Sequence, residues 1–110
     1  MKPEQQLTHQ VMTWLGLRNI LAYRTRNTGT IVHGTRGVVF GRDRYFRQQR
    51  GCADILAWKA GHAYAFELKA PKGRVRPEQA EWLQRFAAAG GTACVVRSLE
   101  EVAAALGEKI

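Results

Sequence analysis

Residues 51–70 read GCADILAWKAGHAYAFELKA, and this stretch decides the fold. Two apolar runs of strand length, 53–59 and 62–70, stand on either side of the dipeptide Ala60-Gly61. A two-residue turn at this dipeptide joins the runs as an antiparallel hairpin and pairs the two residues that flank it. A four-residue turn would keep the same pairing, whereas a three-residue turn would break it. The stretch therefore predicts two central strands of a sheet.

Charged residues interrupt both apolar runs. Asp54 stands near the start of the first run, and Glu67 and Lys69 stand near the end of the second. Because successive side chains alternate between the two faces of a strand, Glu67 and Lys69 share a face. In the predicted pairing Asp54 lies directly opposite Glu67, with Cβ atoms roughly 4.5–5.5 Å apart.

Two carboxylates that face each other repel unless a cation lies between them. A hard divalent ion such as Mg²⁺ suits this position, because it takes oxygen ligands and shares the phosphate oxygens of a substrate. Lys69, one pleat from Glu67, can orient or deprotonate a metal-activated water, or stabilise charge on the phosphate. The three residues thus predict phosphodiester hydrolysis. The alternative is a solvated strand face, with Asp54 as a surface acid near a turn.

The charge of the chain indicates a polyanionic partner. Seventeen basic residues against nine acidic ones give a net charge of +8. Residues 24–50 hold seven arginines and a single acidic residue, Asp43. The guanidinium group presents five donors in a fork that suits phosphate, and a dense basic surface attracts nucleic acid through counterion release. We therefore predict nucleic-acid binding, over the alternative of a protein that is basic and merely soluble.

Composition also bears on the class and location of the protein. An apolar fraction of 45% is ordinary for a globular chain. No apolar run approaches the roughly 18 residues of a membrane span, and the first residues lack the apolar stretch of a signal peptide. Cys52 and Cys94 stand far apart, so neither a disulfide framework nor a zinc knuckle is expected. We expect a cytoplasmic protein with no membrane partner.

Periodicity and turn residues predict the remaining elements. These are a helix from near Pro3 to before Gly16, a strand at 20–26, a short hairpin with strands at 38–40 and 45–46, a helix at 77–89, a strand at 92–97 and a last helix capped by Ser98. Glu101, three residues after Ser98, completes a capping box. The chain is expected to be a single α/β domain over residues 1–110, in the order α-β-(hairpin)-β-β-α-β-α.

The charged motifs follow one another in a recognisable order along the second half of the chain. They are Gly51-Cys-Ala-Asp54, Glu67-Leu-Lys69, the basic turn Lys72-Gly-Arg-Val-Arg, and Gln79 early in the next helix. This pattern resembles the core of the PD-(D/E)XK nucleases, and most closely their VRR-NUC branch. Ala53 replaces the proline of the superfamily name, which shapes the backbone and supplies no ligand. The short length is similar to that of the stand-alone VRR-NUC proteins of phages and bacteria.

The resemblance implies a restriction-endonuclease-like core, with a mixed central sheet flanked by helices. It implies that Asp54, Glu67 and the backbone carbonyl of Leu68 bind Mg²⁺ or Mn²⁺. It also implies that Asp54, Glu67, Lys69 and Gln79 are the catalytic residues of a metal-dependent endodeoxyribonuclease. For Gln79, a hydrogen bond at the start of its own helix is an equally good explanation.

Glu4 is a further candidate metal ligand. Related nucleases place an acidic residue on the first helix, and Glu4 is the only carboxylate before Asp43. It shares a helix face with Leu7 and Val11, which should pack on the sheet. The alternative is that the helix dipole favours an acid in the first turn.

The resemblance also implies a homodimer that cuts branched DNA, such as four-way (Holliday) junctions. A flap-directed nuclease with the same site and a non-catalytic nucleic-acid-binding module are the alternatives. The residues expected to contact DNA are Arg24, Arg26, Asn27, Arg42, Arg44, Lys72, Arg74 and Arg76. Asn27 could instead form a turn, and residues 72–76 could be a solvated basic loop.

Overall fold

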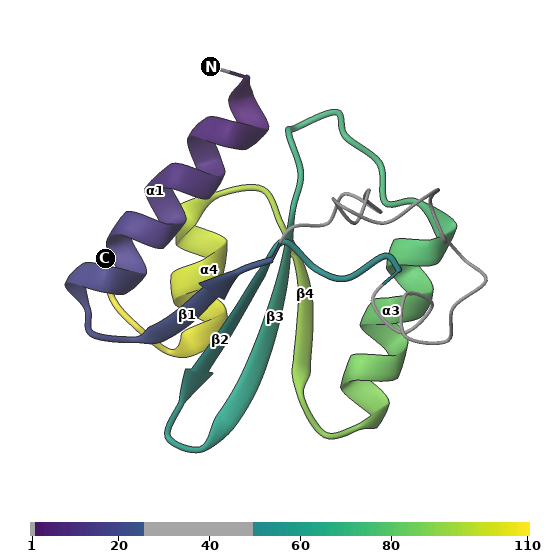
Figure 1. Ribbon diagram of the computed structural model, residues 1–110. Helices are drawn as coiled ribbons and strands as arrows, with labels where there is room; N and C mark the ends of the chain where they lie inside the picture. Colours follow the sequence, from purple (N-terminus) through teal and green to yellow (C-terminus); the bar gives the residue numbers. More distant parts are fainter. Residues whose placement is uncertain (1, 26–49) are drawn as a thin grey trace, which may run out of the picture.

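The computed structural model describes residues 2–25 and 50–110, which form one mixed sheet with helices on both faces (Figure 1). The helices are α1 (Pro3–Leu17), α3 (Pro77–Ala88) and α4 (Leu99–Leu106), and the strands are β1 (Leu21–Arg24), β2 (Ile55–Lys59), β3 (His62–Leu68) and β4 (Thr92–Val96). The α/β class and the order of these elements are as expected from the sequence. The hairpin expected at 38–40 and 45–46 lies outside the described residues.

The sheet has the order β1-β2-β3-β4, with β1, β2 and β3 antiparallel and β4 parallel to β3. Lys59 pairs with His62 across the turn, as predicted. Ala60 and Gly61 both have positive φ, 53° and 79°, which is the geometry of a type I′ turn and matches the twist of the strands. The turn thus fixes the register of the hairpin that carries the charged residues.

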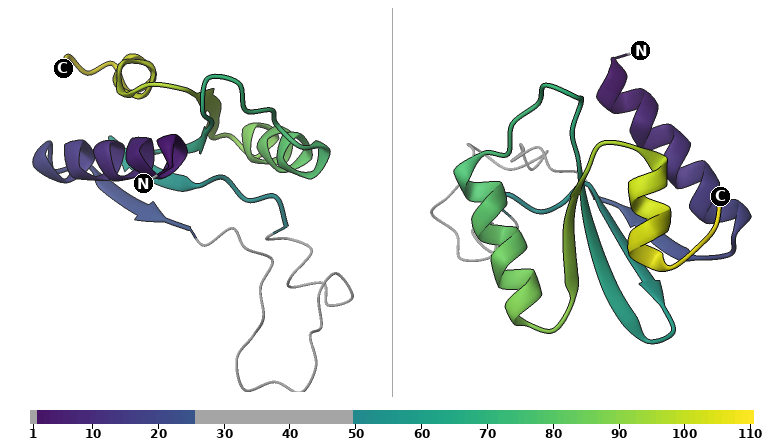
Figure 2. Two further views of the ribbon diagram at one scale, coloured as in Figure 1. Left: turned by 90° about the horizontal axis from the view of Figure 1, so that it is seen from above. Right: turned by 180° about the vertical axis from the view of Figure 1, so that it is seen from behind.

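Helices cover the two faces of the sheet unequally, as Figure 2 shows. One face packs against α1 and α4, and its core consists of Val11, Trp14, Leu15, Ile55, Ala57, Phe66, Leu68, Val96, Leu99, Val102, Ala103 and Leu106. The other face packs against α3 around a smaller core of Ala53, Ala65 and Leu83. Alternate residues of β2 and β3 therefore point into different cores. None of the helices in residues 2–25 and 50–110 is long and apolar enough to cross a membrane.

Helix α1 ends later than the sequence suggested. We expected it to stop before Gly16, but it continues to Leu17. Asn19 adopts a left-handed φ of 58°, and the N–H of Ile20 donates to the carbonyl oxygen of Leu15 at 3.0 Å. These are the features of a Schellman cap, for which asparagine can replace glycine. Gly16 is exposed and remains helical, so the expectation about its role was wrong.

The strands are shorter than the apolar runs that predicted them. Asp54 precedes β2 and Lys69 follows β3, so both leave the regular ladder at the same end of the sheet. At the start of α4, Ser98 Oγ accepts from the N–H of Glu101 at 3.2 Å, as expected. The Glu101 carboxylate accepts from the N–H of Arg97 and not from that of Ser98, so only half of the predicted capping box forms.

Candidate active site

A cavity of about 680 Å³ lies at the end of the sheet where β1 and β3 end and β2 begins. The N-terminal turns of α1 and α3 also contribute to its wall. The lining residues are Glu4, Gln5, Thr8, Arg24, Thr25, Asp54, Glu67, Lys69, Arg76 and Gln79. The structure thus brings together Asp54, Glu67 and Lys69, which the sequence had placed on one face of a hairpin.

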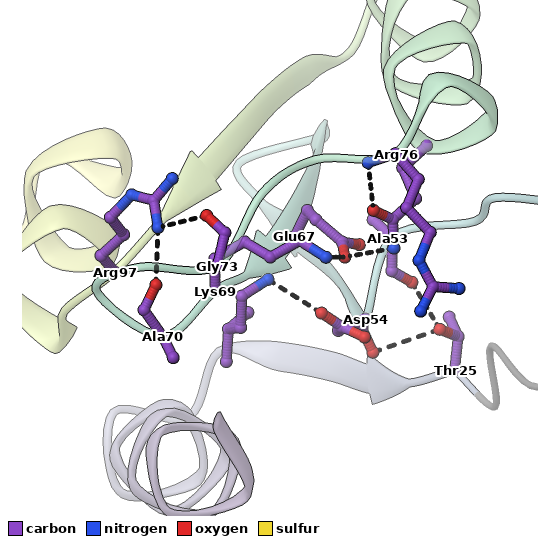
Figure 3. A network of polar contacts seen from close by, with 11 residues as sticks. Thr25, Ala53, Asp54, Glu67, Lys69, Ala70, Gly73, Arg76 and Arg97 are labelled. Atoms are coloured by element: carbon purple, nitrogen blue, oxygen red, sulfur yellow. Dashed lines mark hydrogen bonds and ion pairs between the residues drawn. The ribbon is translucent and has the colours of Figure 1, made fainter. Parts of the chain in front are cut away.

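Asp54 is held by its backbone as well as by its carboxylate. The N–H of Thr25 donates to the Asp54 carbonyl oxygen at 2.9 Å, and Thr25 Oγ1 contacts the carbonyl oxygens of Ala53 and Asp54 (Figure 3). Asp54 Oδ2 accepts from the N–H of Leu68 at 2.8 Å. Because Ile55 pairs with Phe66, one step further along the same register brings Asp54 level with Glu67.

Glu67 is buried, with 1% of its surface exposed. Its Oε2 accepts from Gln79 Nε2 at 2.8 Å and forms an ion pair with Lys69 Nζ at 3.2 Å. Its other oxygen, Oε1, is buried and has no hydrogen-bond partner among the described residues. A buried carboxylate oxygen without a partner is costly, so this atom requires an explanation.

The surroundings of the two carboxyl groups raise the pKa of both. Burial and then the charge of Asp54 raise the pKa of Glu67 to about 7, although Lys69 opposes this shift. Burial is also the main reason why the pKa of Asp54 lies above its usual value, and the charge of Glu4 adds to the effect. The hydrogen bond from the Leu68 N–H opposes it. Both carboxyl groups therefore lie where a further positive charge would stabilise their ionised forms.

Gln79 makes both of the contacts that the sequence left as alternatives. Its Oε1 accepts from the N–H of Arg76 at 2.9 Å, which is a helix-start hydrogen bond. Its Nε2 donates to Glu67, so the same amide also links α3 to the site. Gly51 allows α3 to approach this closely, since a Cβ on Gly51 would lie 2.2 Å from the carbonyl oxygen of Glu78.

The donor set fits a hard divalent cation that retains several waters. Glu67 Oε1 has no hydrogen-bond partner among the residues described, Asp54 contributes a second carboxylate, and Glu4 lines the same cavity. Mg²⁺ commonly binds through one or two carboxylates and completes its shell with water and substrate phosphate oxygens. Among the described residues, no three His, Cys, Asp or Glu side chains lie close enough to form a metal-binding group. An all-protein cage of the zinc type is therefore not formed by that part of the chain.

The residues predicted to bind DNA have different positions. Arg24 and Arg76 line the cavity, at the end of β1 and at the start of α3. Lys72 and Arg74 are exposed on the loop between β3 and α3 and are not part of the lining. The remaining four predicted residues, Arg26, Asn27, Arg42 and Arg44, lie outside the described residues.

Sequence reasoning missed three polar residues of the cavity, Gln5, Thr8 and Thr25. Thr25 follows β1, and the register of β1 on β2 places it level with Asp54. Thr8 is buried one helical turn after Glu4, and its Oγ1 donates to the Glu4 carbonyl oxygen at 2.9 Å. The spacing between Glu4 and Thr8 was a usable signal, because residues four apart share a helix face. For Thr25, the strand pairing had to be known first.

A mixed sheet between helices, with two carboxylates and a lysine at one end, defines a nuclease-type α/β fold. The family model of the VRR-NUC domain matches residues 3–100, and the chain belongs to this family. A solved structure described as a VRR_NUC domain is similar to the whole chain, at a TM-score of 0.65 and 17% sequence identity, with 100% of each chain covered. No curated protein gives a significant match. The fold expected from the sequence resemblance is thereby confirmed.

Proposed function

We propose that this chain is a divalent-metal-dependent endonuclease that hydrolyses DNA phosphodiester bonds. The observation that carries the proposal is the buried Oε1 of Glu67, which lies beside Asp54 and has no hydrogen-bond partner within residues 2–25 and 50–110, with Lys69 Nζ 3.2 Å from the other Glu67 oxygen. A structural salt bridge would leave no such oxygen. Asp54, Glu67 and the backbone carbonyl of Leu68 are the proposed metal ligands. Glu4 lines the same cavity but forms no three-residue metal group with these carboxylates, so its proposed contribution is to bind a water of the metal.

Each side chain has a distinct task in the proposed reaction. A bound Mg²⁺ or Mn²⁺ would polarise the scissile phosphate and make a coordinated water more acidic. Lys69 holds the attacking water and offsets the negative charge that develops on the phosphate. Gln79 fixes the orientation of Glu67 through its Nε2. Arg24 and Arg76 on the cavity wall bind the flanking phosphates, and Lys72 and Arg74 extend this contact along the loop.

For the substrate, we propose branched DNA such as a four-way junction. The net charge of +8 supports a polyanionic partner of large area. The alternative, a flap-directed nuclease, uses the same residues and differs only in the shape of the DNA. A non-catalytic binding module is less well supported, because the two carboxylates and the lysine of the site are all present and meet in one cavity.

We further propose that the active form is a homodimer. Two identical sites related by a two-fold axis can make paired cuts in opposite arms of a junction. The side of the sheet that carries β1 leaves large apolar side chains exposed, among them Leu21 at 70% and Tyr23 at 67%. Trp58, which pairs with Leu21 in the register, belongs to the same surface. Contact with a second copy would bury these side chains and favour association.

Cleavage of a panel of labelled DNAs tests the proposal: linear duplex, single strand, 5′ flap and immobile four-way junction. Each is incubated with Mg²⁺, with Mn²⁺ and with EDTA, beside Asp54→Asn and the matched control Glu108→Gln, which changes a carboxylate that contacts Lys59 and Arg18 instead. We expect paired, metal-dependent cuts in the junction, lost in Asp54→Asn and kept in Glu108→Gln. Cuts confined to flaps would replace the proposed substrate. Binding without cleavage in either metal would overturn the enzyme assignment.

A further inference from the structure

Arg97, directly after β4, contacts the turn that follows Lys69 (Figure 3). Its Nη1 donates to three backbone carbonyl oxygens, those of Ala70 at 2.6 Å, Gly73 at 3.0 Å and Pro71 at 3.4 Å. The N–H of Gly73 donates to the Ala70 carbonyl oxygen at 2.9 Å and closes the turn. A single guanidinium group thus links β4 to most of the backbone of this turn.

Backbone hydrogen bonds hold the two residues at the ends of this contact, Lys69 before the turn and Arg97 after β4. The N–H of Lys69 donates to the carbonyl oxygen of Val96 at 3.0 Å, which extends the β3–β4 ladder by one hydrogen bond. The N–H of Arg97 is bound by the Glu101 carboxylate at the start of α4. The Arg97 side chain therefore fixes the turn relative to β4 and α4.

The turn follows Lys69 directly in the chain and folds back so that Gly73 lies near the start of the Lys69 side chain. A Cβ built on Gly73 would lie 3.5 Å from Lys69 Cβ and 3.3 Å from the Ala70 carbonyl oxygen. Lys69 is 7% exposed, although lysine has a long side chain with many rotamers. Its Nζ lies 3.2 Å from Glu67 Oε2, and the backbone that places its Cα continues directly into the turn.

We propose that Arg97 is a positioning residue that holds the 70–73 turn, which directly follows Lys69, and so helps to fix the lysine ammonium beside Glu67. The inference rests on the proposed nuclease function but names a residue outside the charged motifs. Arg97 acts through Lys69 and does not line the cavity. Its loss should therefore reduce the rate of the chemical step and leave DNA affinity nearly unchanged.

The test compares the full chain with Arg97→Ala and Arg97→Lys. Arg85→Ala is the matched control, because it removes one exposed positive charge from the last turn of α3. Single-turnover cleavage of the best substrate in Mg²⁺ gives the rate of the chemical step, and DNA affinity is measured separately in EDTA. Amide hydrogen exchange at Gly73 reports on the turn without any requirement for activity.

We expect Arg97→Ala to lower the cleavage rate by about tenfold, to change the dissociation constant by less than about twofold, and to accelerate exchange at Gly73 by about tenfold or more. The effects of Arg97→Lys should lie between those of the wild type and Arg97→Ala, because an ammonium group can still donate to some of the carbonyl oxygens but lacks the fork of a guanidinium. Arg85→Ala should behave as the wild type.

An unchanged cleavage rate in Arg97→Ala would overturn the inference, and so would unchanged exchange at Gly73. A defect confined to DNA affinity, with a weaker salt dependence, would also overturn it and would identify Arg97 as a phosphate contact instead. If the wild type cleaves no DNA, the proposed function fails on its own. Exchange at Gly73 then still decides whether Arg97 holds the turn.

Discussion

At the scale of single residues, the buried carboxylate of Glu67 is the part of the site that most disfavours folding. Its Oε2 has two partners, whereas its Oε1 is buried and has none in the part of the chain that the structure describes. A carboxylate in this position destabilises the folded chain unless it is protonated or bound by a cation. This cost is what the proposed metal ion would offset.

This cost predicts how stability depends on pH. The pKa of Glu67 is raised from 4.5 to about 7 in the folded chain, so between these values the folded state binds more protons than the unfolded state. The free energy of unfolding contributed by this group therefore falls as the pH rises through this range, and stays low above it. In EDTA, the free energy of unfolding of Glu67→Gln relative to that of the wild type should rise by on the order of 1–3 kcal/mol from about pH 5 to pH 8. Urea denaturation at both pH values measures the gain, and parallel pH profiles would contradict it.

Gln79 permits a second prediction at this scale. Gln79→Ala removes both amide contacts, leaving the N–H of Arg76 and Glu67 Oε2 with one partner fewer. We expect a loss of about 1–3 kcal/mol in the free energy of unfolding and a lower cleavage rate. Gln84→Ala, an exposed position on the same helix, is the control and should change stability by less than about 0.5 kcal/mol. Equal effects of the two substitutions would show that the contacts of Gln79 do not stabilise the site.

At the scale of elements, the sequence predicted those features that depend on a few neighbouring residues. The Ala60-Gly61 turn fixes the register within a few residues, so the position of Asp54 level with Glu67 followed from the sequence. The end of α1 did not follow, because it depends on a left-handed asparagine and not on the nearer Gly16.

Contacts between distant elements also escaped prediction. Nothing in the sequence marks Thr25 or Arg97. Thr25 reaches the site because β1 pairs with β2, and Arg97 reaches the turn after Lys69 because β4 pairs with β3. The two contacts of Gln79 could each be proposed from the sequence, but their simultaneous formation requires α3 to start beside Glu67. The chemistry of the site was thus more predictable than the residues that hold it in place.

The packing of α3 onto the segment before β2 predicts contrasting effects at two glycines. Gly51 has a φ of 78°, and a Cβ there would lie within 2.5 Å of two backbone atoms of Glu78. Gly51→Ala should therefore destabilise the chain by more than about 2 kcal/mol and displace the helix that carries Gln79. Gly16→Ala, at an exposed helical position with open space around it, should instead stabilise the chain by about 0.5–1 kcal/mol. Thermal and urea unfolding of both variants measure this contrast, and destabilisation of similar size at the two positions would contradict it.

At the scale of the whole molecule, the site forms where both layers of the fold meet. Glu4 comes from α1 on one face of the sheet and Gln79 from α3 on the other, while the central hairpin supplies Asp54 and Glu67. Two arginines, Arg24 and Arg76, lie on the wall of the same cavity. The acidic residues of the site and the two arginines therefore lie at the same end of the sheet.

This arrangement predicts a strong salt dependence of DNA binding. In EDTA, the logarithm of the association constant should fall linearly with the logarithm of the salt concentration. Arg24→Ala and Arg76→Ala should each weaken binding to all DNA shapes and reduce the slope by about 1. Arg85→Ala, at the far end of α3, should leave the slope unchanged. A slope that is the same in all three variants would place the DNA elsewhere on the protein.

A bound cation should stabilise the whole chain, because its ligands come from separate elements of the sheet. Saturating Mg²⁺ should raise the free energy of unfolding of the wild type by about 1–3 kcal/mol relative to EDTA, since an ion that binds only the folded state adds its binding free energy. Asp54→Asn and Glu67→Gln should lose this increment, whereas Glu108→Gln should keep it, because Glu108 contacts Lys59 and Arg18 away from the cavity. Thermal unfolding at constant ionic strength measures the effect without any requirement for cleavage. An equal Mg²⁺ increment in all four proteins would mean that the ion acts on the general charge of the chain, and the two carboxylates would then need another explanation for their proximity.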